Sequence, residues 1–194
     1  MKYIIATHNP HKLEELARIL APLGIEAVTD TMLGIALTEA EETGTTFAEN
    51  AYLKAALACK ESGLPAIADD SGLCIDALGG APGVLSARYA EPGNRKKKVL
   101  AQLADVPPEA RGAYFASAVC CVFPNGDTVT AEGICPGTIG YECRGEGGFG
   151  YDPIFVTENG LTFAELSAEE KDAISHRGVA MREFASRLAA YLNH

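Results

Sequence analysis

The stretch AIADDSG, at residues 66–72, decides how the rest of the sequence is interpreted. Three apolar residues lead into two adjacent carboxylates, Asp69 and Asp70, and then into Ser71 and Gly72, which predicts a buried strand that ends in a turn. Successive side chains of a strand point to opposite faces, so we expect the two carboxylates to diverge unless the turn begins between them. Because ligands of open α/β sheets lie beyond the carboxyl ends of strands, this stretch suggests a divalent metal site. Aspartates that merely form the turn are the alternative.

Composition predicts one folded domain. The chain has 194 residues, 47% hydrophobic and 22% charged, and it is long enough to bury a sizeable core over residues 1–194 as one domain of two lobes. Its formal net charge of -10 argues against a general affinity for nucleic acid or for anionic membranes. A local cluster of cations must therefore hold any anionic ligand.

The cysteines and the first residues of the sequence indicate in which cellular compartment the protein is expected. The six cysteines form no C-x-x-C pair, so we expect them to be reduced core residues of a cytoplasmic protein. The start of the sequence, residues 1–6, is too short an apolar run for a signal peptide, and no later run is long enough to span a bilayer.

Upstream of the Asp-Asp stretch, the pattern predicts a strand, a polar loop and a helix. Residues 3–6 predict the strand and residues 7–12 the loop, while apolar residues recur at helical spacing over 13–20, after a start near Pro10. Lys12 then lies in the first helical turn, where the helix dipole disfavours a cation, so it suggests a nearby anion. An exposed lysine on an amphipathic helix is the alternative.

A second helix is predicted just before the stretch. Thr46 and Glu49 have the spacing of a capping box, and Gly63 is placed to end the helix. Asn50 and Lys54 are four residues apart and share one helix face. They line a cleft or form an exposed polar surface.

Further segments predict strands. Residues 26–38 hold a short one, residues 73–78 another, and runs at 114–123 and 128–134 flank Asn125-Gly126, which predicts a hairpin. A first part rich in strand-helix units, joined to an antiparallel middle, implies a mixed sheet.

Several cations lie outside these elements or open a helix. Arg88 is an anion contact or a surface arginine, and residues 95–98, four consecutive cations, are best explained as the solvated face of a helix. His176 and Arg177 lie near the start of a closing amphipathic helix, where positive charge is unfavourable without an acceptor. They suggest a ligand oxygen, or else they are exposed in a turn between two helices.

A loop rich in glycine and aromatic residues occupies residues 145–153. So many glycines lose backbone entropy on folding unless a ligand must approach the main chain closely. Phe149 or Tyr151 could stack on a base, and the glycine N–H groups could approach phosphate. The loop matches neither the Walker A nor the Rossmann pattern.

Taken together, acidic residues for a metal, scattered cations for phosphates and an aromatic loop for a base describe a nucleoside triphosphate site. The chain also resembles the inosine triphosphate pyrophosphatase family through six motifs in order: THNPHK at 7–12, EETG at 41–44, TFAENA at 46–51, DDSGL at 69–73, GGFGYDP at 147–153 and SHR at 175–177. These motifs span nearly the whole chain.

The resemblance implies a fold, an activity and a set of site residues. The fold is α/β, with a mixed central sheet flanked by helices and two lobes with a cleft between them. The activity is hydrolysis of deaminated purine nucleoside triphosphates (ITP, dITP and XTP) to the monophosphate and pyrophosphate, with Mg²⁺ and in a homodimer. Asp70 resembles the general base, and Glu41 with Asp70 the metal ligands. The substrate contacts implied are Thr7, His8, Asn9, Pro10, His11, Lys12, Ser71, Phe149, Gly150, Tyr151, Asp152, Lys171, His176 and Arg177, and the further candidates are Asn50, Lys54, Asp69 and Arg88.

Hydrogen-bond chemistry predicts the selectivity. Hypoxanthine and xanthine carry an acceptor at position 6 where adenine carries a donor, so donors on His176 or Arg177 would disfavour ATP. A non-catalytic nucleotide sensor and a pyrophosphatase for other modified nucleotides are the alternatives. A phosphatase with an aspartate nucleophile is disfavoured because Asp69 and Asp70 are adjacent rather than one residue apart.

Overall fold

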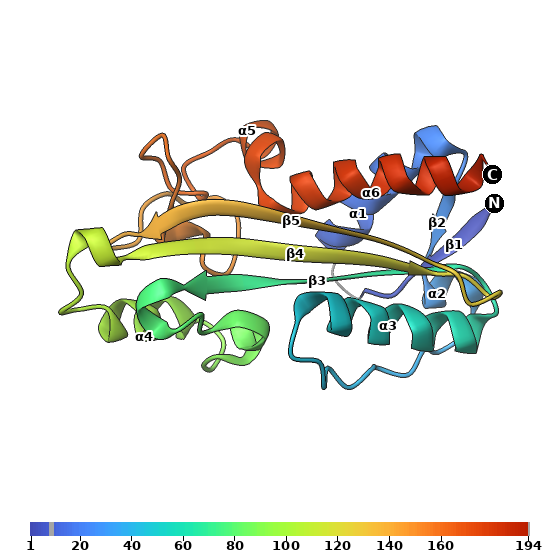
Figure 1. Cartoon of the computed structure of the whole chain (residues 1–194), viewed down its shortest axis with the longest axis horizontal. Helices are drawn as coiled ribbons and strands as arrows, with labels where there is room; N and C mark the ends of the chain where they lie inside the picture. The colour runs from blue at the N-terminus through green and yellow to red at the C-terminus, as the bar shows by residue number, and fades with distance from the viewer. Residues whose placement is uncertain (8–9, 194) are drawn as a thin grey trace. The chain divides into compact units, whose positions relative to one another are not determined.

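The computed structural model describes residues 1–7 and 10–193. Its strands are β1 (Lys2–Ile5), β2 (Glu26–Val28), β3 (Ala66–Ile75), β4 (Gly112–Val122), β5 (Thr128–Ile139) and β6 (Phe155–Val156). Its α-helices are α1 (Pro10–Leu20), α2 (Asp30–Leu33), α3 (Phe47–Ser62), α4 (Arg95–Gln102), α5 (Ala168–Ile174) and α6 (His176–Leu192), and short 3-10 turns connect several of them (Figure 1). Within the described residues, no helix is both long and apolar enough to cross a bilayer.

The strands form a mixed sheet, as predicted. Over the described residues the strand order is β2-β1-β3-β4-β5-β6, with β1 parallel to β2 and β3, and β5 antiparallel to β6. The arrows of β4 and β5 point in opposite directions in Figure 1. Their turn is closed by the N–H of Phe123, which donates to the carbonyl of Asp127, and by Gly126 at φ +92°. The hairpin predicted around Asn125-Gly126 is therefore confirmed.

One local prediction is wrong. Ser71 and Gly72 do not form a turn, because β3 continues through them to Ile75, and residues 76–78 form a 3-10 turn instead of extending a separate strand. β3 lies between β1 and β4 in the sheet, and nine of its ten residues are buried. Hydrogen bonding to neighbours on both sides and burial on both faces outweigh the local preference of Ser-Gly for a turn.

The chain divides into two compact units, and each is described by itself. The first unit comprises Met1–Asp70, Ser117–Gly133 and Val179–His194, and the second comprises Ser71–Ala116 and Ile134–Gly178. The boundary in β3 falls directly after Asp70.

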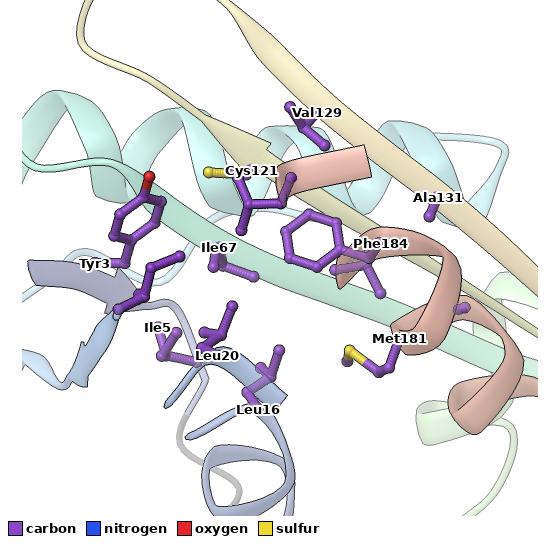
Figure 2. Close-up of a cluster of buried hydrophobic side chains, with 14 of the residues drawn as sticks. Tyr3, Ile5, Leu16, Leu20, Ile67, Cys121, Val129, Ala131, Met181 and Phe184 are labelled. Carbon is purple, nitrogen blue, oxygen red and sulfur yellow. The ribbon is translucent and has the colours of Figure 1, made fainter. Parts of the chain in front are cut away.

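The first unit has helices on both faces of its strands. Tyr3, Ile5 and Ile67 point to the face covered by α1 and α6, where they pack with Leu16, Leu20, Met181 and Phe184 (Figure 2). Residues of opposite parity, Ile4, Ala66 and Ala68, belong to the other buried cluster, which α3 covers with Ala51, Ala55 and Ala58. The alternation of side chains along β1 and β3 thus decides which helix each residue meets.

The second unit has an aromatic core. The ring centroid of Phe115 lies 4.7 Å from that of Phe155 and 5.6 Å from that of Phe163. The buried guanidinium of Arg111 donates to the carbonyls of Leu103, Ile139 and Gly140 at 2.6, 2.8 and 2.7 Å, respectively. Backbone carbonyls therefore satisfy this buried cation.

The six cysteines all lie in described residues and are free thiols. Five are buried, as predicted for core residues, whereas Cys143 is exposed. Burial raises the pKa of the Cys120 and Cys135 thiols to about 11, which keeps them protonated and unreactive at neutral pH.

Tyr3 provides a test of this core. Its side chain is fully buried, its hydroxyl has no hydrogen-bond partner among the described residues, and burial is the main cause that raises its pKa to about 12. Because the unfolded phenol ionises near pH 10 and the folded one only near 12, Tyr3 lowers stability as the pH rises above about 10.

We expect Tyr3→Phe to raise the free energy of unfolding at pH 7 by about 1 kcal/mol, because it removes a buried hydroxyl without a partner. It should also weaken the loss of stability between pH 9 and 11. Urea unfolding at both ends of this range measures the two effects. Tyr191→Phe is the matched control, because its hydroxyl donates to Asp127 at 2.8 Å and its loss should destabilise. A lower stability for Tyr3→Phe would contradict this account.

Candidate functional site

Asp69 and Asp70 point to opposite faces of β3, as the alternation of a strand predicts. Asp69 contacts Lys12 of α1, on the face where Ile67 packs. Asp70 contacts Asn50 and Lys54 of α3, on the face of Ala66 and Ala68. The two carboxylates therefore belong to different groups of side chains within the first unit.

The group around Asp70 joins the strand to α3 and to the acidic loop. Asn50 Nδ2 donates to Asp70 Oδ2 at 3.2 Å, and Lys54 Nζ donates to Asp70 Oδ1 at 3.3 Å. The same Nζ also donates to Glu42 Oε1 at 3.0 Å. Asn50 and Lys54 share a helix face, as predicted, and that face meets Asp70 instead of solvent. One lysine is thus shared by two carboxylates.

Gly44 brings the acidic loop close to α3. Its N–H donates to Asn50 Oδ1 at 2.9 Å, so the Asn50 amide bridges the loop and Asp70. A Cβ atom at Gly44 would lie 2.7 Å from both Asn50 Oδ1 and Glu49 Cβ. Thr46 and Glu49 form the predicted capping box, which holds the start of α3 beside this loop.

The group around Asp70 carries more negative than positive charge, because two carboxylates share one lysine. Burial is the main cause that raises the pKa of the Asp70 carboxyl; Lys54 lowers this pKa and Glu42 raises it. Burial by itself would lower the pKa of Lys54. The surrounding carboxylates have the larger combined effect, and the pKa of Lys54 is raised. Carboxylate and amide oxygens with excess negative charge are the donors that a hard divalent cation prefers. In this group Asp70 and Glu42 supply the carboxylate oxygens, and Lys54 Nζ lies between them as their countercharge.

Glu41, the predicted metal ligand, is exposed, and its neighbour Glu42 is the acidic residue that contacts Lys54. Across residues 1–7 and 10–193, no set of three or more His, Cys, Asp or Glu side chains is gathered as metal ligands would be. Sequence reasoning missed Glu42 and the role of Gly44. The family resemblance named Glu41 in this loop, whereas Glu42 is the carboxylate that turns toward Lys54.

Lys12 has the nearby anion that its place at the start of α1 suggested. Its Nζ lies 2.6 Å from Asp69 Oδ2, and the Asp69 side chain is 1% exposed. A buried carboxylate is costly unless it is paired, so Asp69 and Lys12 each compensate the other. The anion beside Lys12 is therefore a side chain of the protein, the carboxylate of Asp69.

A third lysine-aspartate pair lies in the second unit. Lys171 Nζ donates to Asp152 Oδ2 at 2.6 Å, and the N–H of Phe149 donates to the same oxygen at 2.8 Å. The ring of Phe149 is half exposed, and Lys171 Nζ lies 5.1 Å from its centroid. Gly148, at φ +67°, lies so close to the Asp152 carboxylate that a Cβ atom would collide with it.

The remaining nucleoside candidates differ in exposure. Tyr151 is buried, its hydroxyl donates to the carbonyl of Ser86 at 2.9 Å, and burial raises its pKa to about 12. His176 is buried, and its ring stacks on that of Phe115 with 4.7 Å between the ring centroids. The Arg177 guanidinium carbon lies 5.8 Å from the centroid of the Phe149 ring. Of the two aromatics proposed to stack on a base, Phe149 is the one with an accessible ring.

The structure also locates the other predicted residues. Thr7 follows β1 and is partly buried, Ser71 is partly buried in β3, Gly150 has φ +62° in the aromatic loop, and Arg88 is exposed at the end of the 3-10 turn Gly83–Arg88. Pro10 and His11 open α1. His8 and Asn9 lie outside the described residues.

Comparisons with known proteins cover nearly the whole chain. The sequence model of the Ham1 family matches residues 3–187. A dITP/XTP pyrophosphatase from Haemophilus influenzae is 50% identical over 196 residues, covering 96% of this chain and 98% of that protein. The solved structure of a HAM1 protein from Coxiella burnetii has a TM-score of 0.90 at 41% identity and covers 98% of this chain and 99% of its own. A crystal structure titled nucleoside-triphosphatase and dITP/XTP pyrophosphatase, from Mycobacterium abscessus, has a TM-score of 0.80 at 47% identity, with coverage of 94% and 96%.

These likenesses first define a class: a mixed α/β protein with the fold of the solved HAM1 proteins. The chain belongs to the Ham1 family. The fold class and the family resemblance inferred from the six motifs are both confirmed.

We expect Gly44→Ala to lower the free energy of unfolding by about 1–3 kcal/mol, because the new Cβ must displace Asn50 or Glu49. Chemical denaturation measures this loss. Thr43→Ala, at the exposed neighbouring residue, is the matched control and should change stability by less than about 0.5 kcal/mol. Equal stability of the two variants would show that the loop does not depend on this close approach.

Proposed function

We propose that this protein hydrolyses deaminated purine nucleoside triphosphates, dITP, ITP and XTP, to the monophosphate and pyrophosphate. The observation that carries the proposal is the similarity, over nearly the full length of both chains, to a relative named dITP/XTP pyrophosphatase. The buried Asp70 group and the exposed Phe149 ring, flanked by cations, supply the chemistry that such a reaction needs.

Asp70 is the proposed general base. Water attacks the α-phosphorus, the bond from that phosphorus to the bridging oxygen breaks, pyrophosphate leaves, and Asp70 accepts a proton of the water. Beside a bound metal ion an aspartate stays ionised at neutral pH, so its basicity is modest. Asn50 and Lys54 hold the two oxygens of Asp70 in a fixed orientation, so that positioning adds to basicity.

Two lysines that contact the middle of β3 would bind the phosphate tail. Lys12 and Lys54 are held by Asp69 and Asp70, which fixes where their ammonium groups can meet an anion. The first turn of α1 would add the backbone N–H groups of His11 and Lys12 and the positive end of the helix dipole, and Ser71 would add a hydroxyl.

Mg²⁺ is the proposed cofactor, held by Asp70 and Glu41 with Glu42 beside them. When bound, it would neutralise charge on the phosphate oxygens. We also propose that the protein works in the cytoplasm as a homodimer, in keeping with its family resemblance.

The base would be recognised by stacking and by donors. Phe149 offers a ring face, and Lys171, His176 and Arg177 offer N–H groups toward the 6-oxo acceptor of hypoxanthine or xanthine. ATP presents a 6-amino donor there and would leave a buried donor without an acceptor, which costs about 1–3 kcal/mol. Selection against ATP follows from this mismatch.

A nucleotide panel tests the proposal. We expect release of pyrophosphate from dITP, ITP and XTP at rates at least about tenfold above ATP, and loss of release after removal of divalent cations with recovery on addition of Mg²⁺. The readout is pyrophosphate against orthophosphate. Release of orthophosphate would indicate another phosphohydrolase, and tight nucleotide binding without release would indicate a sensor.

We expect Asp70→Asn to lower kcat for dITP by at least about 100-fold with the fold retained, because an amide cannot accept the proton. Circular dichroism checks the fold. Glu39→Gln, which removes an exposed acid from the acidic loop, is the matched control and should leave kcat unchanged. Turnover by Asp70→Asn near that of the control would remove Asp70 from the role of base.

A further inference from the structure

The segment between α2 and α3, residues 35–44, forms neither helix nor strand and runs along α3 in the direction opposite to that helix (Figure 1). Side chains of α3 hold it in place by hydrogen bonds. The pairs, from the start of the helix to its end, are Asn50 with Gly44, Lys54 with Glu42 and Glu61 with Thr38. We call residues 38–44, which these bonds span, the strap.

The residues of α3 that hold the strap share one face of the helix. An α-helix turns about 100° per residue, so positions 50, 54 and 61 fall within about 40° of one another around its axis. The alanines of α3 that pack on the sheet lie on the neighbouring face. Asn50 and Lys54 reach both the strap and Asp70, whereas Glu61 lies about two turns beyond Lys54 and contacts the end of the strap.

The strap has little slack. Positions 50 and 61 are about 16 Å apart along the helix axis. Positions 38 and 44 of the strap can be at most about 22 Å apart, even in a fully extended chain. A segment that uses most of its reach has few alternative paths between its two ends. The bond at Glu61 therefore fixes which residue of the strap lies opposite Lys54.

We propose that Glu61 is a positioning residue for the reaction: it fixes one end of the strap, so that Glu42 meets Lys54 and orients this lysine beside Asp70. The inference rests on the proposed function. Lys54 Nζ lies 3.0 Å from Glu42 Oε1 and 3.3 Å from Asp70 Oδ1, so its place depends on both carboxylates. Glu61 acts on Asp70 through the strap and not by contact with the substrate.

The bond between Thr38 and Glu61 is charge-assisted. Its donor is the Thr38 N–H, at 2.8 Å from Glu61 Oε2, and this bond lowers the pKa of the Glu61 carboxyl, which is ionised at neutral pH. Glutamine at position 61 would keep an oxygen that accepts the same N–H, whereas alanine would leave this N–H to water. The two replacements therefore separate loss of the bond from loss of the charge.

We expect Glu61→Ala to lower kcat for dITP about fivefold, because Lys54 and Asp70 lose part of their fixed orientation, and to change KM less than twofold. Glu61→Gln should retain at least about half of the wild-type kcat. Glu42→Gln should lower kcat at least as much as Glu61→Ala, and the double variant should match Glu42→Gln, because the two residues act in one chain of contacts. Release of pyrophosphate measures all four proteins.

Hydrogen exchange gives a second readout, which needs no turnover. The N–H of Thr43 donates to the carbonyl of Glu41, and the N–H of Gly44 donates to Asn50. We expect both amides to exchange about tenfold faster in Glu61→Ala, although each lies several residues from Thr38. Glu61→Gln should keep the wild-type rates.

Glu26→Ala, which removes an exposed acid from β2, is the matched control and should behave as the wild type in both experiments. A residue with only a structural role would lower stability and leave kcat and the exchange of Gly44 unchanged, and that result would overturn the proposal. Multiplicative effects in the double variant, or equal losses in Glu61→Gln and Glu61→Ala, would also overturn it. If the wild type releases no pyrophosphate, the proposed function fails, while the exchange rates still decide whether Glu61 fixes the strap.

Discussion

The structure of the first unit depends on β3, a strand with nearly every residue buried that carries two carboxylates side by side. A buried carboxylate must be paired, and neighbouring residues of a strand cannot share a partner, because their side chains leave from opposite faces. Asp69 is therefore paired with a lysine from α1 and Asp70 with a lysine from α3. The helices on the two faces serve both as the apolar cover of the sheet and as the carriers of its countercharges.

The same arrangement recurs in the second unit, where Lys171 pairs with buried Asp152. Buried ion pairs contribute little net stability, because the cost of removing both ions from water offsets their attraction. What they provide is a fixed place for each ammonium group. In a chain of net charge -10, a dedicated buried aspartate keeps each of these lysines in one place, away from the other acids of the surface.

The sequence was sufficient for the elements that depend on local signals. The capping box at Thr46 and the hairpin around Asn125-Gly126 both form where the pattern predicts them. It failed at Ser71-Gly72, because the neighbours that keep β3 extended, β1 and β4, come from remote parts of the chain. The family resemblance named Glu41 as a metal ligand, whereas Glu42 is the acidic residue that contacts Lys54. The close approach of Gly44 to Asn50 in the same loop is a tertiary contact that no spacing rule describes.

The distribution of thiols has a practical consequence for experiments in solution. Cys143 is the single exposed cysteine among the described residues, and the other five are shielded from reagents. A maleimide dye would therefore attach at one position of the natural sequence, without the removal of any other cysteine. That position lies six residues before Phe149 in the chain, so fluorescence from this label offers a direct spectroscopic view of the aromatic loop in a protein that has no tryptophan.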